Sequence, residues 1–327
     1  MNQGSEQFWI VSKDFDGVRL DYWIKKELKI LSYPFICKII RKGAIKVNNK
    51  RVSNTFSLAL GDKIKLSKNI KIEKNNISIN SYKKFEPLIK SWIIFKNKNL
   101  IVLNKPSGIA VQGGTKIKVN IDILLDYLMF ETQEKPKLLH RLDKNTSGIL
   151  LLARNLKYAN FMGLKFKERK IEKKYITIVK GIPKIKKGKI EIPIKEKDRV
   201  YNAITLYKVL KSSKDESILM IKTITGRKHQ IRKHLSQIGF TILGEKKIFF
   251  QNQDRNNNTN FFLHALQLSF EDFNRKLIQL NAPIPKYFAE KLKDMNLSID
   301  DLSSYTDFTN HDDYKIINLT NDSIQKR

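Results

Sequence analysis

Apolar residues near the N-terminus recur at helical spacing. They predict a helix whose buried face is formed by Leu20, Trp23, Ile24 and Leu28. A second helix is predicted to begin near Pro34, because proline suits the first turn of a helix. Its buried face is formed by Ile36, Ile39 and Ile40. Apolar and polar residues then alternate over residues 45–47 and 64–66, which predicts short strands. Together these elements predict a compact α/β module.

The longer part of the chain shows a different pattern. Apolar runs typical of strands recur over residues 100–103, 149–152, 175–179 and 218–221. Helical patterns lie between some of these runs, over residues 121–130 and 158–168. A further helix is predicted after residue 229, with a narrow apolar stripe formed by Ile231, Leu235 and Ile238. Strands and helices in this mixture predict the α+β fold class, with a mixed sheet.

These patterns divide the chain into four segments. The α/β module covers residues 10–67, and a Lys- and Asn-rich stretch over residues 68–90 is interpreted as a linker. The main domain covers residues 91–297, with a polar loop over residues 251–260. Residues 298–327 carry six aspartates and little periodicity, so they are expected to form a partly disordered acidic tail.

Charge points to a polyanionic partner. The 327 residues include 63 Lys and Arg against 32 Asp and Glu, a formal net charge of +31, and neutralising phosphates releases counterions. Amino-acid usage typical of an AT-rich genome is an alternative source of many of these lysines. No run of 18 apolar residues and no secretory signal is found, and one cysteine excludes an internal disulfide. We therefore expect a cytoplasmic protein that does not enter a membrane, and we expect a monomer.

One segment combines charged residues in an arrangement suited to catalysis. The sequence HRLDKNTSG over residues 140–148 places Asp143 on a loop before an apolar strand, with Arg141 and Lys144 beside it. Neighbouring cations favour the ionised carboxylate, which can act as a nucleophile or base. An isolated Asp-Lys pair is more often a surface ion pair, so the motif needs support from the rest of the chain.

That support comes from a family resemblance. HRLDKNTSG resembles the signature of the RluA/RluC/RluD class of RNA pseudouridine synthases. Four further segments match the family's motifs in the same order: LNKPSGIAV (residues 103–111), KKYITIVKG (173–181), TGRKHQIRKH (225–234) and FLHALQLSF (262–270). Residues 17–67 resemble an S4 RNA-binding domain. The closest likeness within the class is to the RluC type, which modifies large-subunit ribosomal RNA, so this RNA is the expected partner.

The resemblance assigns roles to individual residues. Asp143 is implied to be the catalytic carboxylate, Tyr175 the aromatic residue that stacks on the target base, and Arg232 the ion-pair partner of Asp143. Arg141 is implied to occupy the space that the flipped base leaves. Arg232 is expected at the border between the buried and exposed faces of its helix. The remaining predicted RNA contacts are Arg227, His229, Lys105, Arg19, Lys38, Arg41 and Lys42.

The predicted reaction needs no cofactor. Ordinary glycosidases use two carboxylates, whereas a uracil anion leaves without comparable help, so one aspartate can suffice. Asp143 either attacks the sugar or abstracts a proton to form a glycal. His229 and His234 are five residues apart on a helix and do not converge on a metal. A non-catalytic RNA-binding protein remains the alternative. The sequence departs from the family pattern at LGEKKIFF (residues 243–250), where Glu245 replaces the usual aspartate, and after Phe270.

Overall fold

The computed structural model describes residues 7–28, 33–67, 79–113, 119–132, 134–196, 198–245, 260–309 and 313–318. The chain forms two compact units, residues 1–83 and residues 84–327. No helix within the described ranges is long and apolar enough to cross a bilayer. The predicted polar loop over residues 251–260 lies almost wholly outside the described residues.

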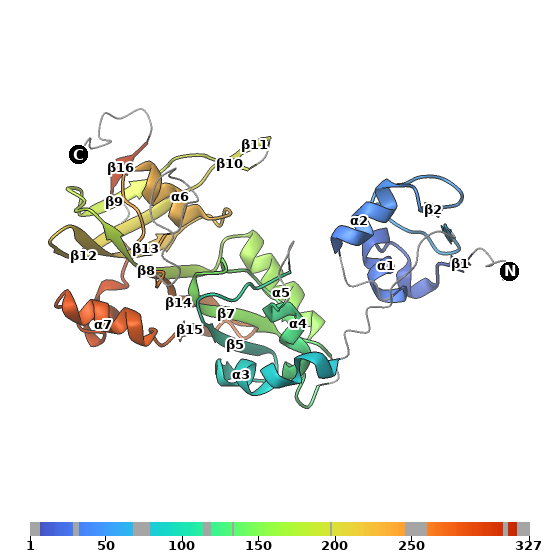
Figure 1. Cartoon of the computed structure of the whole chain (residues 1–327), viewed down its shortest axis with the longest axis horizontal. Coiled ribbons are helices and arrows are strands. Elements are labelled where there is room, and N and C mark those ends of the chain that lie inside the picture. The colour runs from blue at the N-terminus through green and yellow to red at the C-terminus, as the bar shows by residue number, and fades with distance from the viewer. Residues whose placement is uncertain are drawn as a thin grey trace. The chain divides into compact units, whose positions relative to one another are not determined.

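The smaller unit is a three-stranded antiparallel sheet packed against two helices (Figure 1). Its elements are β1 (Gln7–Ile10), η1 (Lys13–Phe15), α1 (Leu20–Glu27), α2 (Tyr33–Arg41), β2 (Ile45–Val47) and β3 (Lys63–Leu66). The strands run in the order β1-β3-β2. The apolar stripes predicted for the two helices are buried together in one core with the sheet. The basic side chains Lys38, Arg41 and Lys42 are exposed along α2. The two predicted helices and the strands at residues 45–47 and 64–66 are therefore confirmed.

The larger unit is built on a mixed 11-stranded sheet among the described residues. Along its main path the strands run in the order β16-β9-β12-β13-β8-β14-β7-β5-β4, and β15 and β6 pair with β14 and β7. The strands are β4 (Ile93–Lys96), β5 (Leu100–Lys105), β6 (Lys137–Leu138), β7 (Ser147–Ala153), β8 (Glu172–Lys180), β9 (Lys187–Ile190), β12 (Thr205–Ser213), β13 (Glu216–Thr223), β14 (Leu263–Glu271), β15 (Leu277–Asn281) and β16 (Lys315–Ile317). A separate ribbon pairs β10 (Ile194–Glu196) with β11 (Arg199–Tyr201). The predicted α+β class is confirmed.

Helices cover both faces of this sheet (Figure 1). They are α3 (Glu86–Ser91), α4 (Ile121–Leu124), η3 (Leu125–Leu128), α5 (Leu156–Lys167), α6 (Gln230–Gln237), α7 (Lys286–Asp294) and η4 (Asp300–Tyr305). The stripe Ile231, Leu235 and Ile238 packs α6 against the face of β8 that carries Val179. Helix α7 packs against the opposite face, where Ile176 and Ile178 lie. Both faces of the central strands are buried, so these strands read as continuous apolar runs.

The predicted segment boundaries need two corrections. The end of the expected linker is helical: η2 spans Ile79–Phe85, and α3 follows it with Ile89 fully buried. Part of the expected disordered tail is folded, because η4, β16 and the residues next to them place apolar side chains in the core of the larger unit. These side chains are Leu302, Phe308, Tyr314 and Ile317. Their wide spacing hides them from a periodicity argument.

Candidate active site

The catalytic loop predicted around Asp143 connects β6 to β7. The backbone N–H of Thr146 donates to the carbonyl oxygen of Asp143 at 3.1 Å, which closes a turn around the aspartate. Gly148 then enters β7 with φ of 107°, and a Cβ there would lie 2.2 Å from the carbonyl oxygen of Ala265. Only glycine permits both that conformation and that approach. The signature glycine therefore fixes the point at which the catalytic loop ends and β7 begins.

Strand pairing brings four of the sequence motifs into one row across the sheet. Tyr175 of β8 pairs with Ala265 of β14, Ala265 pairs with Gly148 of β7, and Gly148 pairs with Lys105 of β5. The ladder between β8 and β14 carries a register shift between Ala265 and Gln267, beside Tyr175. Such bulges redirect side chains near functional sites. The sheet thus gathers motifs that are far apart in the sequence.

Two basic side chains from the third motif lie against the Asp143 carboxylate. Arg232 donates from Nη1 to Oδ2 at 3.3 Å, and Nε2 of His229 lies 3.5 Å from Oδ1. Burial lowers the pKa of His229, and the positive charge of Arg232 adds to this effect. The imidazole is therefore largely neutral near pH 7. Arg232 supplies the positive charge at the carboxylate, so the ion pair implied by the family resemblance is present.

Arg232 itself is held by a second carboxylate. Its Nε and Nη2 donate to the two carboxylate oxygens of Glu245 at 2.7 and 2.6 Å, and the Arg232 side chain is only 6% exposed. The expected position of Arg232 at the border between helix faces is therefore wrong, because both of its carboxylate partners lie on the protein side. Glu245 follows Gly244, whose φ is 81°. The sequence marked Glu245 only as a departure from the family pattern and did not reveal its contact with Arg232.

Buried polar contacts set the start of α6 and so the positions of His229 and Arg232. Gln230 is 4% exposed. Its amide nitrogen donates to the carbonyl oxygen of Ile204 at 3.0 Å, and its Oε1 accepts from the backbone N–H of Arg227 at 3.0 Å. His229 takes the left-handed conformation with φ of 56° directly before the helix. The turn therefore projects His229 away from the helix and towards Asp143.

Tyr175 lies on the α6 face of β8, within electrostatic reach of Asp143. Burial raises the pKa of Tyr175 to about 12, and the negative charge of Asp143 adds to the rise. Its hydroxyl therefore stays protonated at neutral pH. The ring packs against the core beneath α6 and is only partly buried. A neutral, partly exposed aromatic ring near the carboxylate suits stacking on a base.

Lys105 was predicted to contact RNA, and the structure contradicts this. Its side chain is fully buried, and Nζ donates to the carbonyl oxygens of Pro106, Ile109 and Lys144 at 2.9, 2.9 and 3.0 Å. An ammonium has three hydrogens to donate, and all three are used. Burial lowers the pKa of Lys105 to about 7, against the opposing effect of Asp143. Lys105 therefore ties the first motif to the catalytic loop instead of facing a phosphate.

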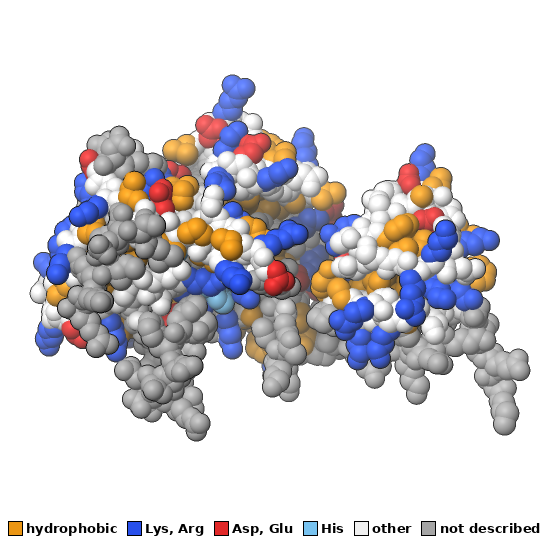
Figure 2. All heavy atoms as spheres, turned by 90° about the horizontal axis from the view of Figure 1, so that it is seen from above, with side chains coloured by type: hydrophobic (Ala, Val, Ile, Leu, Met, Phe, Trp, Pro, Cys, Tyr) orange, Lys and Arg blue, Asp and Glu red, His pale blue; other side chains and the backbone are white. Residues whose placement is uncertain are grey.

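The other predicted RNA contacts fall into separate places. Arg141 is exposed on the catalytic loop itself. Arg227 lies over the ring of Tyr201 at 5.0 Å and donates from Nε to the carbonyl oxygen of Asn202 at 3.2 Å. In the smaller unit, Arg19 is partly occupied by an ion pair with Asp21 at 2.5 Å. Figure 2 shows lysine and arginine side chains spread over the visible surface of each unit, with fewer acidic ones.

The two histidines weighed as a metal pair have unrelated environments. His234 is fully buried, and its ring nitrogens contact Thr205 Oγ1 and the carbonyl oxygen of Ile192, both at 2.9 Å. His229 faces Asp143 instead. The geometry therefore separates them, as their spacing predicts. No group of three or more His, Cys, Asp or Glu placed to bind a metal occurs in the described part of the chain.

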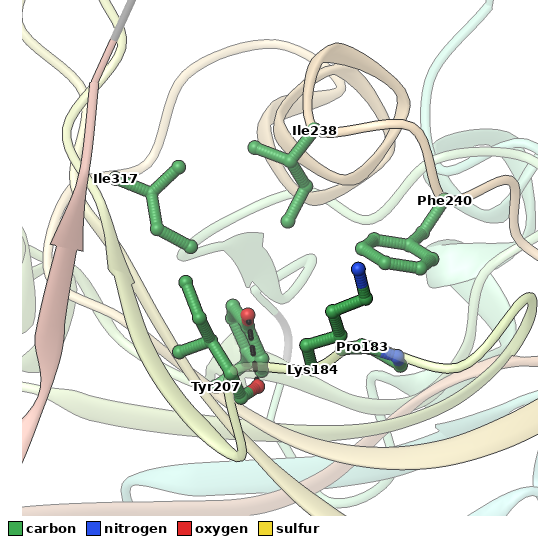
Figure 3. A pocket seen from close by; sticks show the side chains of 7 residues that line it. Pro183, Lys184, Tyr207, Ile238, Phe240 and Ile317 are labelled. Atoms are coloured by element: carbon green, nitrogen blue, oxygen red, sulfur yellow. Dashed lines mark hydrogen bonds between the residues drawn. The ribbon is translucent and has the colours of Figure 1, made fainter. Parts of the chain in front are cut away.

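A small apolar cavity lies apart from these residues. Its volume is about 10 Å³, and Tyr207, Ile238, Phe240 and Ile317 line it together with residues 183–185 (Figure 3). The Tyr207 hydroxyl donates to the carbonyl oxygen of Ile185 at its edge. A space of this size holds about one water molecule and no base. None of the predicted catalytic residues lines it.

Comparison with known proteins decides the family. A family model described as RNA pseudouridylate synthase matches residues 99–237. Ribosomal large subunit pseudouridine synthase C of Buchnera aphidicola subsp. Baizongia pistaciae is 30% identical over 315 residues, which cover 89% of this chain and 98% of that protein. The chain belongs to the RNA pseudouridylate synthase family. It is an RNA pseudouridine synthase, as its signature motif indicates.

Further comparisons agree with this assignment. A protein from Rickettsia felis, also named ribosomal large subunit pseudouridine synthase C, is 33% identical over 295 residues and covers 84% of the chain. Among solved structures, human RNA pseudouridylate synthase domain containing 4 matches with a TM-score of 0.58 and 26% identity. That match covers 67% of this pseudouridine synthase and 99% of the human chain. The predicted family and the mixed-sheet fold of the synthase are confirmed.

Proposed function

We propose that this pseudouridine synthase isomerises specific uridines of large-subunit ribosomal RNA, with Asp143 as its catalytic carboxylate. The observation that carries the proposal is the placement of Asp143 on the signature loop, 3.3 Å from Arg232 and within electrostatic reach of Tyr175. The choice of substrate RNA is supported by the names of the bacterial relatives, ribosomal large subunit pseudouridine synthases that match over most of this chain.

The reaction breaks the bond between C1′ of the ribose and N1 of uracil. The electron pair leaves with the base as a uracil anion. The base then turns, and C5 forms a new bond to C1′. C5 finally loses its hydrogen as a proton, and N1 gains one, so the product is an isomer of the substrate. Asp143 takes part in one of two ways. It attacks C1′, and its bond to C1′ breaks when C5 bonds there; or it abstracts a proton from C2′ to form a glycal and returns that proton to C2′ when C5 bonds to C1′. Both routes require the carboxylate to be ionised.

The neighbours of Asp143 support these roles. The buried guanidinium of Arg232 fixes the carboxylate in one orientation, and positioning of a reacting group is a large part of catalysis. A target base in folded RNA must be flipped out, which costs a few kcal/mol. Stacking on an aromatic ring returns about 1–3 kcal/mol, and Tyr175 offers such a ring. Arg141 is exposed on the same loop, where it can fill the space left by the base.

The basic surface supplies the rest of RNA binding. Arg227 and His229 belong to the same turn before α6 and serve as RNA contacts near the reacting base. Lys38 and Arg41 on α2 and Lys42 directly after it, together with Arg19, extend this binding through an S4-like N-terminal unit. Counterion release from phosphates then makes affinity salt-dependent. We infer that the protein acts as a monomer in the cytoplasm, where ribosomal RNA is matured, and uses no cofactor.

Replacement of Asp143 tests the proposed function. Asp143→Asn keeps the size of the side chain and removes its charge, so pseudouridine formation on a large-subunit RNA transcript should fall at least about a thousand-fold. Chemical mapping of pseudouridine on the transcript measures this, and a filter-binding assay should show nearly unchanged RNA affinity. Asp300→Asn, an exposed aspartate on η4, is the control and should retain full activity. Turnover by Asp143→Asn at the wild-type rate would overturn the assignment.

A further inference from the structure

Lys173, at the edge of the active site, is a cation that has no partner among the residues that the structure describes. It lies on β8 two residues before Tyr175, so both side chains point to the α6 face of the strand. Its Nζ lies 3.7 Å from the position that a Cβ would take at Gly226. It is half-buried and makes no hydrogen bond or ion pair with any residue that the structure describes. The ammonium therefore loses part of its hydration, and no hydrogen bond or ion pair with a described residue replaces it.

The charges that reach Lys173 are of the same sign. Burial lowers the pKa of Lys173, and the positive charge of Arg169 lowers it further. In turn, partial burial lowers the pKa of His140, and the positive charge of Lys173 lowers it further. A desolvated cation that faces another cation is unfavourable unless an anion joins it. The arrangement is therefore incomplete without a negatively charged ligand.

The next residue shows that the chain can neutralise a lysine here. Lys174 points to the opposite face of β8, where its Nζ donates to Oε1 of Gln267 at 2.9 Å and lies 3.7 Å from Glu172. Glu172 also accepts from Lys222 at 2.5 Å. Glu172, the acidic residue nearest to Lys173 in the sequence, therefore pairs with lysines on the opposite face of β8. On the α6 face, no acidic side chain of the described ranges neutralises Lys173.

The position of Lys173 connects it with the reaction centre. His140, whose pKa is lowered first by burial and then by the positive charge of Lys173, begins the catalytic loop that carries Asp143. Gly226, against which the ammonium packs, directly precedes Arg227 in the turn that carries His229. The ammonium therefore lies between the two segments that form the site. An anion bound there sits beside the nucleotide on which Asp143 acts.

We propose that Lys173 and Arg169 form a subsite that binds one backbone phosphate of the substrate RNA next to the target uridine. The inference rests on the proposed function, because it takes RNA as the ligand. A phosphate accepts several charge-assisted hydrogen bonds and carries the full negative charge that two neighbouring cations require. A uracil carbonyl oxygen carries no such charge. Phosphate binding would also draw the nucleotide into the site before the base stacks on Tyr175.

Equilibrium binding of full-length variants to one RNA fragment tests the subsite. The fragment is a stem-loop of large-subunit RNA in which the wild-type enzyme converts a uridine to pseudouridine. Lys173→Gln should weaken binding about tenfold and should lower the slope of log affinity against log salt by about 0.7–0.9. Lys174→Gln is the matched control on the other face and should change both quantities little. Lys173→Arg keeps the charge and should bind nearly as well as the wild type.

A second measurement separates a binding role from a structural one. Because Lys173 has no partner in the described residues, Lys173→Gln should leave the melting temperature of the RNA-free enzyme unchanged or raise it. A lower melting temperature together with unchanged affinity would mean that Lys173 is structural and would overturn the subsite.

The phosphate itself can be located by replacing single phosphates of the fragment with uncharged methylphosphonates. One replacement near the target uridine should weaken wild-type binding and should have no effect on Lys173→Gln. If every replacement weakens both proteins equally, no phosphate is bound at Lys173. If the wild type converts no uridine of any large-subunit RNA, the proposed function fails instead, so the two failures are distinct.

Discussion

Glu245 holds Arg232 through both carboxylate oxygens and leaves only Nη1 for Asp143. This division predicts a role in positioning. In Glu245→Gln the amide can accept only one of the two hydrogen bonds, so Arg232 can turn and pair more fully with Asp143. We expect kcat to fall by about 10- to 100-fold, which corresponds to about 1.4–2.7 kcal/mol of transition-state free energy. Single-turnover assays with saturating RNA measure this effect.

The conservative variant distinguishes positioning from folding. Glu245→Asp restores both the charge and the residue usual in the family motif, so it should recover most of the lost rate while RNA affinity stays constant in all three proteins. Thermal unfolding monitors the cost of altering a buried ion pair. A rate for Glu245→Gln within twofold of the wild type would show that Arg232 holds its place without Glu245.

At the scale of residues, the sequence predicted which residues form the site better than it predicted the contacts around each side chain. Asp143, Tyr175 and Arg232 come together as the motifs implied, because the motif glycines and strand pairing fix their positions. Lys105 was misjudged because a lysine in a sequence carries no sign that three carbonyl oxygens surround it. The role of Glu245 was missed for the same reason. Its partner is 13 residues away, and only the folded chain brings them together.

At the scale of elements, the segment after residue 297 differs most from expectation. Strand β16 pairs in parallel with β9 at the edge of the sheet, from Lys315 to Ile317. Lys187 of β9 also forms a 3.1 Å ion pair with Asp313, so the acidic residues meet the basic surface of the domain itself. A covered edge strand cannot pair with another chain. The strongly periodic elements were predicted correctly, whereas this segment has too few apolar residues for its pattern to be recognised.

This folded segment predicts a measurable contribution to stability. Phe308 is 3% exposed and packs among side chains of α7 and the sheet. Phe308→Ala should lower the free energy of unfolding by about 3–5 kcal/mol, because it removes a large buried side chain and leaves a cavity. Ile316→Ala in β16 is the control, since Ile316 is 44% exposed and its loss should cost no more than about 0.5 kcal/mol. Denaturant unfolding compares them. If Phe308→Ala and Ile316→Ala unfold at the same denaturant midpoint, the segment does not pack on the domain in solution.

At the scale of the whole molecule, the net charge of +31 raises the question of which cations contact RNA. Lys38 and Arg41 on α2 and Lys42 directly after it are exposed together, and none of them has an acidic partner in the described part of the smaller unit. If each contacts one phosphate, replacing all three with glutamine should lower the slope of log affinity against log salt by about 2–3. Lys25 and Lys26 on α1 are the control, because they are equally exposed on the same unit. Titration of a large-subunit RNA fragment over a range of salt concentrations measures both slopes. If the slope changes by the same amount for each charge removed from either helix, the basic residues of α2 contribute only to the overall positive charge and make no specific phosphate contacts.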